Sequence, residues 1–476
     1  MNTTPVLPDE PLDEGVPVPL LAQGPVARTL VRLTLPMLVA MLAMAGFNIV
    51  DTFYLGQLGT AQLAAMGFTL AVVMTVSSIS MGLGVGTTAV ISRVIGRGDG
   101  LGMQRLSMNA ILLGLLVAMC ISVVGLVTID PLFRLMGATG IVLDHIHAYM
   151  AIWFLGLPLV IVPQIGNSAI RATGDTKTPA LIMISAMTAN AVLDPLFIFG
   201  LGPVAAMGMQ GAAIATVLSQ AIALIVSFNV LLRRGLITFA RQSWRELADG
   251  WRRILTIGVP AAVTQLITPV STGIVIGIVA TYGIAAVAGF GVASRLEMFA
   301  VMVINALGSA LVPFIGQNWG AGNKERVGRA VKVALALASG WGLMVWLLSI
   351  AFGRPVASIF NDNPLVIATV MSYMAIVFPS LFLLGALTTV NSALNALHKP
   401  LVSMMLSLVR MLVLYVPLAF LGSALMGLTG VWWAAFAANV ASGIVAVVWF
   451  RRIFHDLERG LPPAAKKAGE PLPAAS

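Results

Sequence analysis

The sequence is poor in charge, histidine and cysteine, and each shortage excludes a class of protein. Only 9% of its 476 residues are charged, against about 25% in soluble domains, and 59% are hydrophobic. The single Cys120 excludes an intramolecular disulfide and a cysteine-based metal cluster, and the 4 histidines are not grouped as metal ligands. The chain has no Walker A sequence, paired Asp motif or His–Glu cluster. We therefore expect no enzyme and no cofactor.

Long apolar runs are what the sequence has in abundance. Its mean hydropathy is +0.97, and runs of about 20 residues, each able to cross about 30 Å of hydrocarbon, recur along the chain. We predict twelve membrane-spanning helices, because an open sheet cannot satisfy its backbone in lipid. They cover approximately residues 34–57, 66–90, 106–128, 148–168, 179–200, 211–232, 254–281, 290–316, 330–352, 366–392, 401–422 and 429–450.

The basic residues gather in alternate loops and so predict an orientation. The net charge of +9 lies mainly in segments such as 93–105, 233–253, 324–332 and the tail from Arg451, while the intervening loops hold little Lys or Arg. This positive-inside pattern predicts that both termini are cytoplasmic, and it argues against nucleic-acid binding. We expect disordered cytoplasmic tails over 1–33 and 453–476, and a basic linker over 233–253 lying at the membrane surface.

The chain contains an internal duplication. Pro36 recurs at Pro260, 224 residues later, and the same offset relates the tetrapeptides 149–152 and 373–376, both YMAI. Six helices in each copy give the copies the same orientation in the membrane, with an axis along the membrane normal between them. We predict an all-α protein of two pseudo-symmetric six-helix lobes, 34–232 and 254–452. Such lobes are suited to alternating-access transport around a central site.

Two acids interrupt the apolar runs at matching heights. Asp51 lies 19 residues after Arg32, and Asp194 lies 17 residues after Lys177. At about 1.5 Å per residue, both lie roughly 25–28 Å from the same membrane face. A carboxylate at this depth is costly and is usually functional. The pair predicts a proton or cation site within the first lobe.

Neighbouring residues suit such a site. Asn190 precedes Asp194 by one helical turn, so its amide can reach the carboxylate. Thr216 follows the start of the sixth helix by about five residues, which places its hydroxyl at a similar height. Pro195 frees a backbone carbonyl one turn earlier and bends the helix, and Pro36 is expected to bend the first helix. The alternative is that the acids only fix helix packing.

Several motifs resemble the multidrug and toxic compound extrusion (MATE) family. These are the run 35–68 (LPMLVAMLAMAGFNIVDTFYLGQLGTAQLAAMGF), the loop 171–179 (RATGDTKTP), and NAVLDPLFIFG followed by MGMQGAAIAT. The similarity covers about residues 28–455. It implies two six-helix bundles in a V, in a bacterial inner membrane. It also implies export of lipophilic, usually cationic compounds in exchange for H⁺ or Na⁺, with no resident cofactor or metal; we expect a monomer.

The resemblance also bears on the coupling ion. The second lobe lacks the acids of the NorM-type branch, because Gln265 and Gly385 stand at those places. Asp51, Asn190, Asp194 and Thr216 are instead similar to the first-lobe set of the DinF branch, which implies proton coupling. Some members of the family bind Na⁺ with this set, so sodium stays open as the alternative ion.

Two further charged residues interrupt the second lobe. Glu297 and Arg410 lie within predicted helices, and each is open to a structural role or to a place on the substrate path or at its mouth. Gln265 is a third candidate for the substrate path or its mouth. A related flippase of lipid-linked oligosaccharides would need basic residues around its cavity, and Arg410 is the main residue of that kind here. The acidic first lobe favours the drug exporter.

Overall fold

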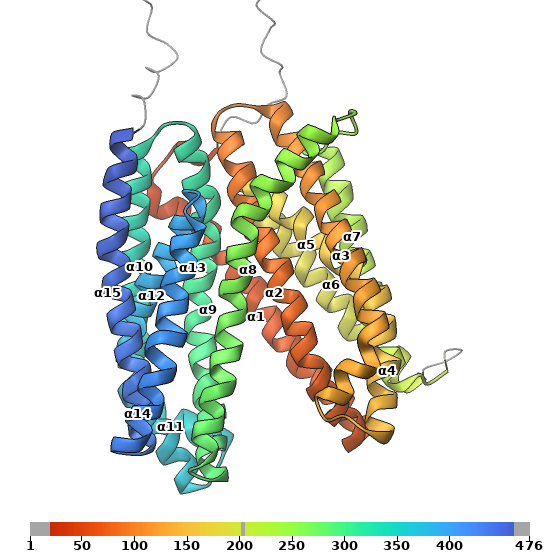
Figure 1. The fold of residues 1–476 in the computed structure, drawn as a ribbon, viewed down its shortest axis with the longest axis vertical. Coiled ribbons are helices and arrows are strands. Elements are labelled where there is room, and N and C mark those ends of the chain that lie inside the picture. The colour runs from red at the N-terminus through yellow and green to blue at the C-terminus, as the bar shows by residue number, and fades with distance from the viewer. Residues whose placement is uncertain (1–19, 201–204, 461–476) are drawn as a thin grey trace, which may run out of the picture.

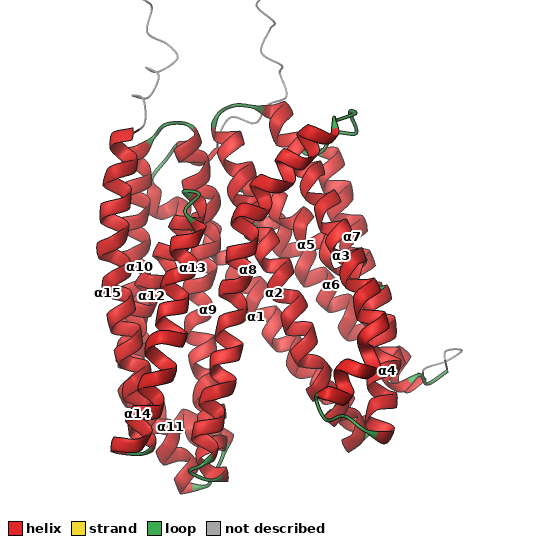
Figure 2. Cartoon of the chain, viewed as in Figure 1, coloured by secondary structure: helices red, strands yellow, loops and turns green. Residues whose placement is uncertain are grey.

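The computed structural model describes residues 20–200 and 205–460, and most of these are helical (Figure 2). Eleven of the described helices are long and apolar enough to cross a membrane, and the pair α4–α5, bent by 48°, makes up to twelve spans. The all-α polytopic fold predicted from the apolar runs is confirmed.

The described elements form two lobes (Figure 1). The N lobe comprises η1 (Leu20–Ala22), α1 (Val26–Leu58), α2 (Thr60–Gly96), α3 (Gly100–Leu135), α4 (Gly140–Leu155), α5 (Leu157–Ala172), α6 (Lys177–Pro195), η2 (Leu196–Gly200) and α7 (Gly208–Arg233). The C lobe comprises α8 (Trp244–Ala280), α9 (Ile284–Gly320), α10 (Lys324–Phe360), α11 (Pro364–Val377), η3 (Phe378–Ser380), α12 (Leu381–Ala396), α13 (Pro400–Leu408), η4 (Val409–Tyr415), α14 (Val416–Met426) and α15 (Leu428–Gly460).

The lobes lie close together at the face where α15 ends, called here the terminal face, and diverge toward the opposite face (Figure 1). Helices α2 and α8 pack against each other across the lobe boundary, and α1 packs against α9. Equivalent turns in the two lobes use equivalent glycines, which explains part of the sequence repeat. Gly59 and Gly283, separated by the 224-residue offset, have φ of 136° and 101°, in the region that favours glycine.

Buried amides join the lobes at the terminal face. The Gln317 side chain of α9, fully buried, accepts from the backbone N–H of Leu21 at 3.3 Å and donates to the carbonyl of Ala172 at 2.8 Å. The adjacent Asn318 donates to the carbonyl of Leu21 at 3.0 Å. The short segment around Leu21, before α1, is therefore held to the C lobe by both amides. The end of α5 is held to the C lobe by the Gln317 amide.

Arg326 of α10 completes this contact, which we call the terminal latch. Its guanidinium lies 5.3 Å from the ring centroid of Phe314 and donates to three carbonyls, those of Leu21, Gln23 and Gly24. Hydrogen bonds from a charged donor are each worth about 1.5–3 kcal/mol. The latch therefore favours the arrangement in which the lobes meet at the terminal face.

We expect Arg326→Ala to loosen this face. The test uses protein in which Cys120 is replaced by alanine and a cysteine is placed at the buried Leu21. Arg326→Ala should make maleimide labelling of this cysteine about tenfold faster than in the same protein with Arg326. The reason is that the loss of charge-assisted hydrogen bonds shifts the opening equilibrium by at least that factor. Arg329→Ala is the matched control, since Arg329 is exposed and pairs only with Glu325 in the described chain. Equal labelling rates in the two variants would refute the latch.

The structure corrects the predicted boundaries of the tails and the linker. The disordered tail predicted over 1–33 is wrong from Leu20 onward, because η1 and the first turns of α1 pack on the C lobe; residues 1–19 lie outside the described chain. Helix α15 likewise continues to Gly460, and 461–476 lie outside the described residues. Within the linker, Ser243 and Glu246 form a capping box, so α8 already begins at Trp244.

Candidate functional site

Asp194 is the most deeply buried carboxyl group of the N-lobe site. Its side chain, near the end of α6, is 0% exposed, and Asn190 one turn earlier donates to its Oδ1 at 3.0 Å. Its other oxygen, Oδ2, is buried and has no hydrogen-bond partner among the residues that the structure describes. An unsatisfied buried carboxylate oxygen is costly. The position is therefore suited to holding a proton or another cation on Oδ2.

The backbone changes its hydrogen-bonding pattern directly after this residue. Helix α6 ends at Pro195, and the chain continues as the π-helical segment η2. Proline has no N–H to donate, and π-helical turns often mark functional positions. The predicted bend at Pro195 is thus placed next to Asp194. Pro36 lies inside α1.

Asp51 approaches Asp194 from the neighbouring helix. Helices α1 and α6 pack together, and the two carboxyl groups are close enough to repel each other electrostatically. Asp51 is partly buried, and neither acid forms an ion pair with a described Lys, Arg or His. The structure thus brings together the two acids that the sequence placed at one depth. Two unpaired acids in one site favour binding of positive charge.

Two further side chains complete this N-lobe cluster. Tyr149 of α4 is 6% exposed, interacts electrostatically with both acids, and lies beside the hydroxyl of Thr216 of α7. Thr216 therefore reaches the site through Tyr149. Sequence reasoning missed Tyr149 as a site residue, although the repeated YMAI tetrapeptide that contains it was a signal. A tyrosine in an apolar helix is usually a packing residue.

Gln265 lies apart from this cluster. It is on α8, and its amide nitrogen is 3.9 Å from the sulfur of Met81 on α2, at the contact between the lobes. No hydrogen bond joins it to either acid within the described residues. Gln265 is placed at the lobe boundary, and its role on the substrate path stays a prediction.

Glu297 and Arg410 belong to a second cluster, in the C lobe. The Tyr373 hydroxyl donates to Glu297 Oε2 at 2.5 Å, and Arg410 Nη1 donates to Asn439 at 3.1 Å. Asn439 in turn donates to Ser380 at 2.9 Å. Glu297 and Arg410 interact electrostatically, but no ion pair within 4.0 Å joins them. These two residues thus interact at a distance, and each is held by its own hydrogen-bonded partners.

The motif loop before α6 is fixed by an ion pair outside the membrane spans. Asp175 accepts from the backbone of Lys177 and Thr178 at 2.9 and 3.0 Å and from Arg234 Nη1 at 2.6 Å. Burial of the Asp175 carboxyl raises its pKa, but its bonds with Thr178 and Arg234 outweigh burial and bring the pKa below its usual value. Stability from this loop is thus present above about pH 4 and lost as the pH falls through the lowered pKa.

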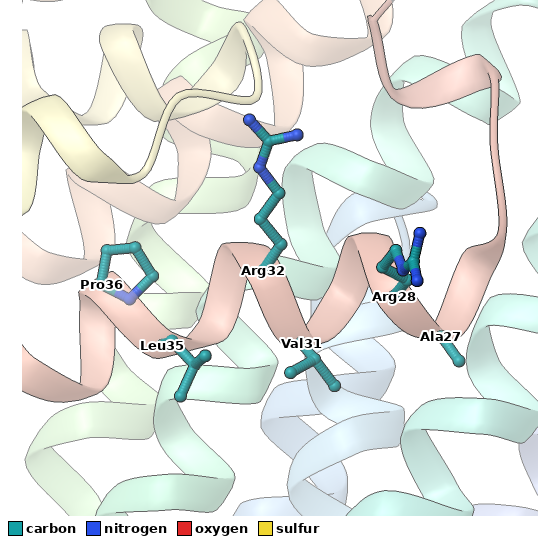
Figure 3. Close-up of a pocket in the computed structure, with 6 residues that line it drawn as sticks. All are labelled: Ala27, Arg28, Val31, Arg32, Leu35 and Pro36. Atoms are coloured by element: carbon teal, nitrogen blue, oxygen red, sulfur yellow. The ribbon is translucent and has the colours of Figure 1, made fainter.

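An open hollow of about 670 Å³ lies along the start of α1, away from both clusters. Its lining residues are Ala27, Arg28, Val31, Arg32, Leu35 and Pro36 (Figure 3). Ala27, Val31 and Leu35 project from one side of α1, and the two arginines project from the other (Figure 3). It contains no acid. It is a surface feature of α1 and contributes nothing to the acidic site.

These observations define a class of protein. A polytopic helical protein has the construction of a secondary membrane transporter when it has two similar lobes and, in one of them, two intramembrane acids that no described basic residue pairs. Within the described residues, no group of three His, Cys, Asp or Glu side chains could hold a metal ion.

The particular family follows from comparison with known proteins. The model of the MatE family matches residues 36–196 and 260–421, once in each lobe, so the chain belongs to that family. The FAD transporter of Shewanella oneidensis is 36% identical over 91% of this chain and 96% of that protein. The probable multidrug resistance protein YpnP of Bacillus subtilis is 27% identical over 90% of this chain and 96% of that protein.

A solved structure agrees with this assignment. A mutant of the Vibrio cholerae MATE transporter VcmN superposes with a TM-score of 0.86 at 30% identity, over 90% of this chain and 97% of that one. The protein is accordingly a multi-pass membrane transporter of small organic compounds, with multidrug efflux relatives, and not an enzyme.

Proposed function

We propose that the protein exports lipophilic, mainly cationic compounds in exchange for inward protons, which it loads at Asp51 and Asp194. The observation that carries this proposal is the acid pair itself, with Asp194 fully buried and Asp51 partly buried. Among the described residues neither acid has a basic partner, and Asp194 Oδ2 has no hydrogen-bond partner. Asn190 holds one oxygen of Asp194, while Tyr149 and Thr216 border the pair. Loading one proton relieves the repulsion between the acids and allows the π-helical turn beside them to rearrange.

The energetics suit this exchange. One charge crossing 100 mV gains about 2.3 kcal/mol and one pH unit adds about 1.4, so one proton can sustain a gradient on the order of 100-fold for a neutral substrate. A substrate that carries one positive charge outward cancels the electrical contribution, and the pH difference alone then drives its export. In this proposal the transporter works as a monomer in a bacterial inner membrane.

Two alternatives concern the ion and the cargo. Sodium would use the same oxygens, those of Asp51, Asn190, Asp194 and Thr216. A flavin dinucleotide is a second candidate cargo, which the 36% identical relative named FAD transporter favours over any other single compound. Such a cargo is anionic, and the acid pair would then serve the coupling ion alone.

Everted membrane vesicles test the coupling ion. With ethidium outside, an imposed gradient that is acid inside should drive accumulation at least tenfold above vesicles without the protein, because protons leaving the lumen exchange for the dye. An imposed sodium gradient at equal pH should drive no more than background. Accumulation that needs sodium and ignores the pH gradient would replace the proton with Na⁺ in this proposal.

Orientation is tested by cysteine labelling in intact cells. With Cys120 replaced by alanine, a cysteine at Ala285 should react with an impermeant maleimide from outside. Cysteines at Ser243 or Asn323, both in turns before helices, should react only after permeabilisation, because the basic loops are retained inside. Labelling of Ser243→Cys from outside would reverse the orientation and the direction of transport.

A further inference from the structure

The C lobe contains a polar cluster built like the acidic cluster of the N lobe. Tyr373 of α11 is the repeat mate of Tyr149. Arg410 is the second residue of the π-helical segment η4, and Asp194 lies two residues before the π-helical segment η2. Asn439 lies on α15, the last span of its lobe, as Thr216 lies on α7. The same three spans of each lobe therefore carry a buried polar site.

The two clusters differ in charge. The N-lobe cluster has two acids and no described basic partner, whereas the C-lobe cluster combines Glu297 with Arg410. Glu297 is already engaged by the Tyr373 hydroxyl at 2.5 Å, and Tyr373 is fixed in turn by Trp432, whose ring centroid lies 4.9 Å away at 75°. Glu297 is thus held by a neutral donor, and it does not neutralise Arg410 by direct contact.

Arg410 keeps donors that no group in the described part of the chain accepts. An arginine has five N–H donors and stays protonated in proteins. In the described structure only Nη1 has an acceptor, Asn439 Oδ1, and Nε is buried without a partner. The Tyr415 hydroxyl, at the other end of η4, also interacts with this cluster electrostatically and forms no hydrogen bond with a described residue. The open donors of this partly buried cation call for an anionic acceptor.

The position of the cluster favours access from the space between the lobes. Arg410 is only partly buried, and a guanidinium exposed to lipid at this depth would be costly, so its open side faces the protein interior. Segment η4 packs beside α8, the helix that packs against α2 across the lobe boundary. A compound held between the lobes can therefore reach Arg410.

We propose that Arg410 and Tyr415 form an anion subsite, which binds a phosphate or carboxylate group of transported compounds. Arg410 donates to the anion in the planar fork that suits such groups, Tyr415 adds a hydroxyl, and Glu297, held by Tyr373, limits how much positive charge the site presents. The substrate class then extends from cations to compounds with an aromatic body and an acidic group. This inference rests on the proposed transport function, but not on the identity of the coupling ion.

Riboflavin and its 5′-phosphate form a matched pair of probes, because they differ by one phosphate group. The quenching of flavin fluorescence is measured as purified protein in a neutral detergent is added, and riboflavin 5′-phosphate should bind about tenfold more tightly than riboflavin. Arg410→Gln should reduce this ratio of the two affinities to about one and leave riboflavin binding unchanged. Tyr415→Phe, which removes only the hydroxyl, should lower the ratio several-fold. Arg295→Gln, an equal charge change at an exposed residue of α9, should not alter it.

Several results would overturn the anion subsite. An unchanged ratio in Arg410→Gln, or equal binding of the two flavins by the wild type, would do so. If Arg410→Gln fails to fold, Arg410→Lys and Tyr415→Phe carry the test, and a wild-type ratio in both refutes the subsite. The same titrations are repeated in nanodiscs of phosphatidylcholine and in nanodiscs of phosphatidylglycerol, which is anionic. If the preference for riboflavin 5′-phosphate is lost only in phosphatidylglycerol, the group that binds at Arg410 is a lipid phosphate and not a transported compound. Ethidium transport by the same variants in everted vesicles tests the transport function separately, since the cation does not need Arg410.

Discussion

Asp194→Asn should reduce ethidium efflux driven by a pH gradient to the background of empty vesicles, a loss of about 100-fold or more. The reason is that an amide cannot release a proton, so substrate movement is no longer tied to proton movement. Expression should survive, because a neutral amide is less costly than a charge at this depth, and Asn190 can still hydrogen-bond to it. Initial rates of ethidium accumulation in everted vesicles give the measurement.

Matched controls separate coupling from folding. Asp130→Asn makes the same change at an exposed residue of α3 that contacts His147, and its efflux should equal that of the wild type. Ethidium binding to purified Asp194→Asn should stay within about twofold of the wild type, because the apolar surfaces that hold the dye are unchanged. Near-normal pH-driven efflux in Asp194→Asn would make this acid structural.

The second large effect concerns Asp51 and the way the two acids combine. Asp51→Asn alone should also abolish pH-driven efflux, because the two carboxyl groups lie within electrostatic reach and share one proton-loading network. The double variant should therefore be no worse than either single variant, as groups that act as one unit are strongly non-additive. The comparison needs efflux rates for the wild type, both singles and the double at equal expression.

Additive losses would contradict a shared network. If Asp51→Asn and Asp194→Asn each reduced efflux about tenfold and the double variant about 100-fold, the acids would act independently.

Glu297→Gln serves as the reference in the other lobe. It should lower ethidium efflux only modestly, because Glu297 is engaged by Tyr373 and belongs to the C-lobe cluster. Complete loss in Glu297→Gln would move proton coupling to the C lobe.

The acid pair was predictable from the sequence because depth in a membrane can be counted along a helix. Distances from Arg32 and Lys177 placed Asp51 and Asp194 at one height, and the structure brings them together. The spacing of Asn190 from Asp194 likewise predicted the hydrogen bond that is found. The twelve-span architecture followed from the apolar runs and the internal duplication, and the family followed from the resemblance of particular motifs.

Contacts between segments far apart in the chain were not predictable in the same way. Tyr149 and Tyr373 looked like packing residues, because nothing local shows that acids from other helices face them. The terminal latch was missed because residues 20–25 are too short to give a periodic signal, and the acceptors of Arg326 are backbone carbonyls, which have no sequence signature. Its signal was the polar pair Gln317 and Asn318 inside an apolar helix.

The central claim is that substrate and proton exchange at the N-lobe acids. The release of protons when substrate binds tests this claim most directly. Purified protein in weakly buffered solution is mixed with saturating ethidium, and a pH indicator reports the protons released. The wild type should release close to one proton per bound dye in the pH range where efflux is active, and Asp194→Asn should bind the dye and release none. Equal proton release from both proteins would contradict the claim, because the proton would then come from another group.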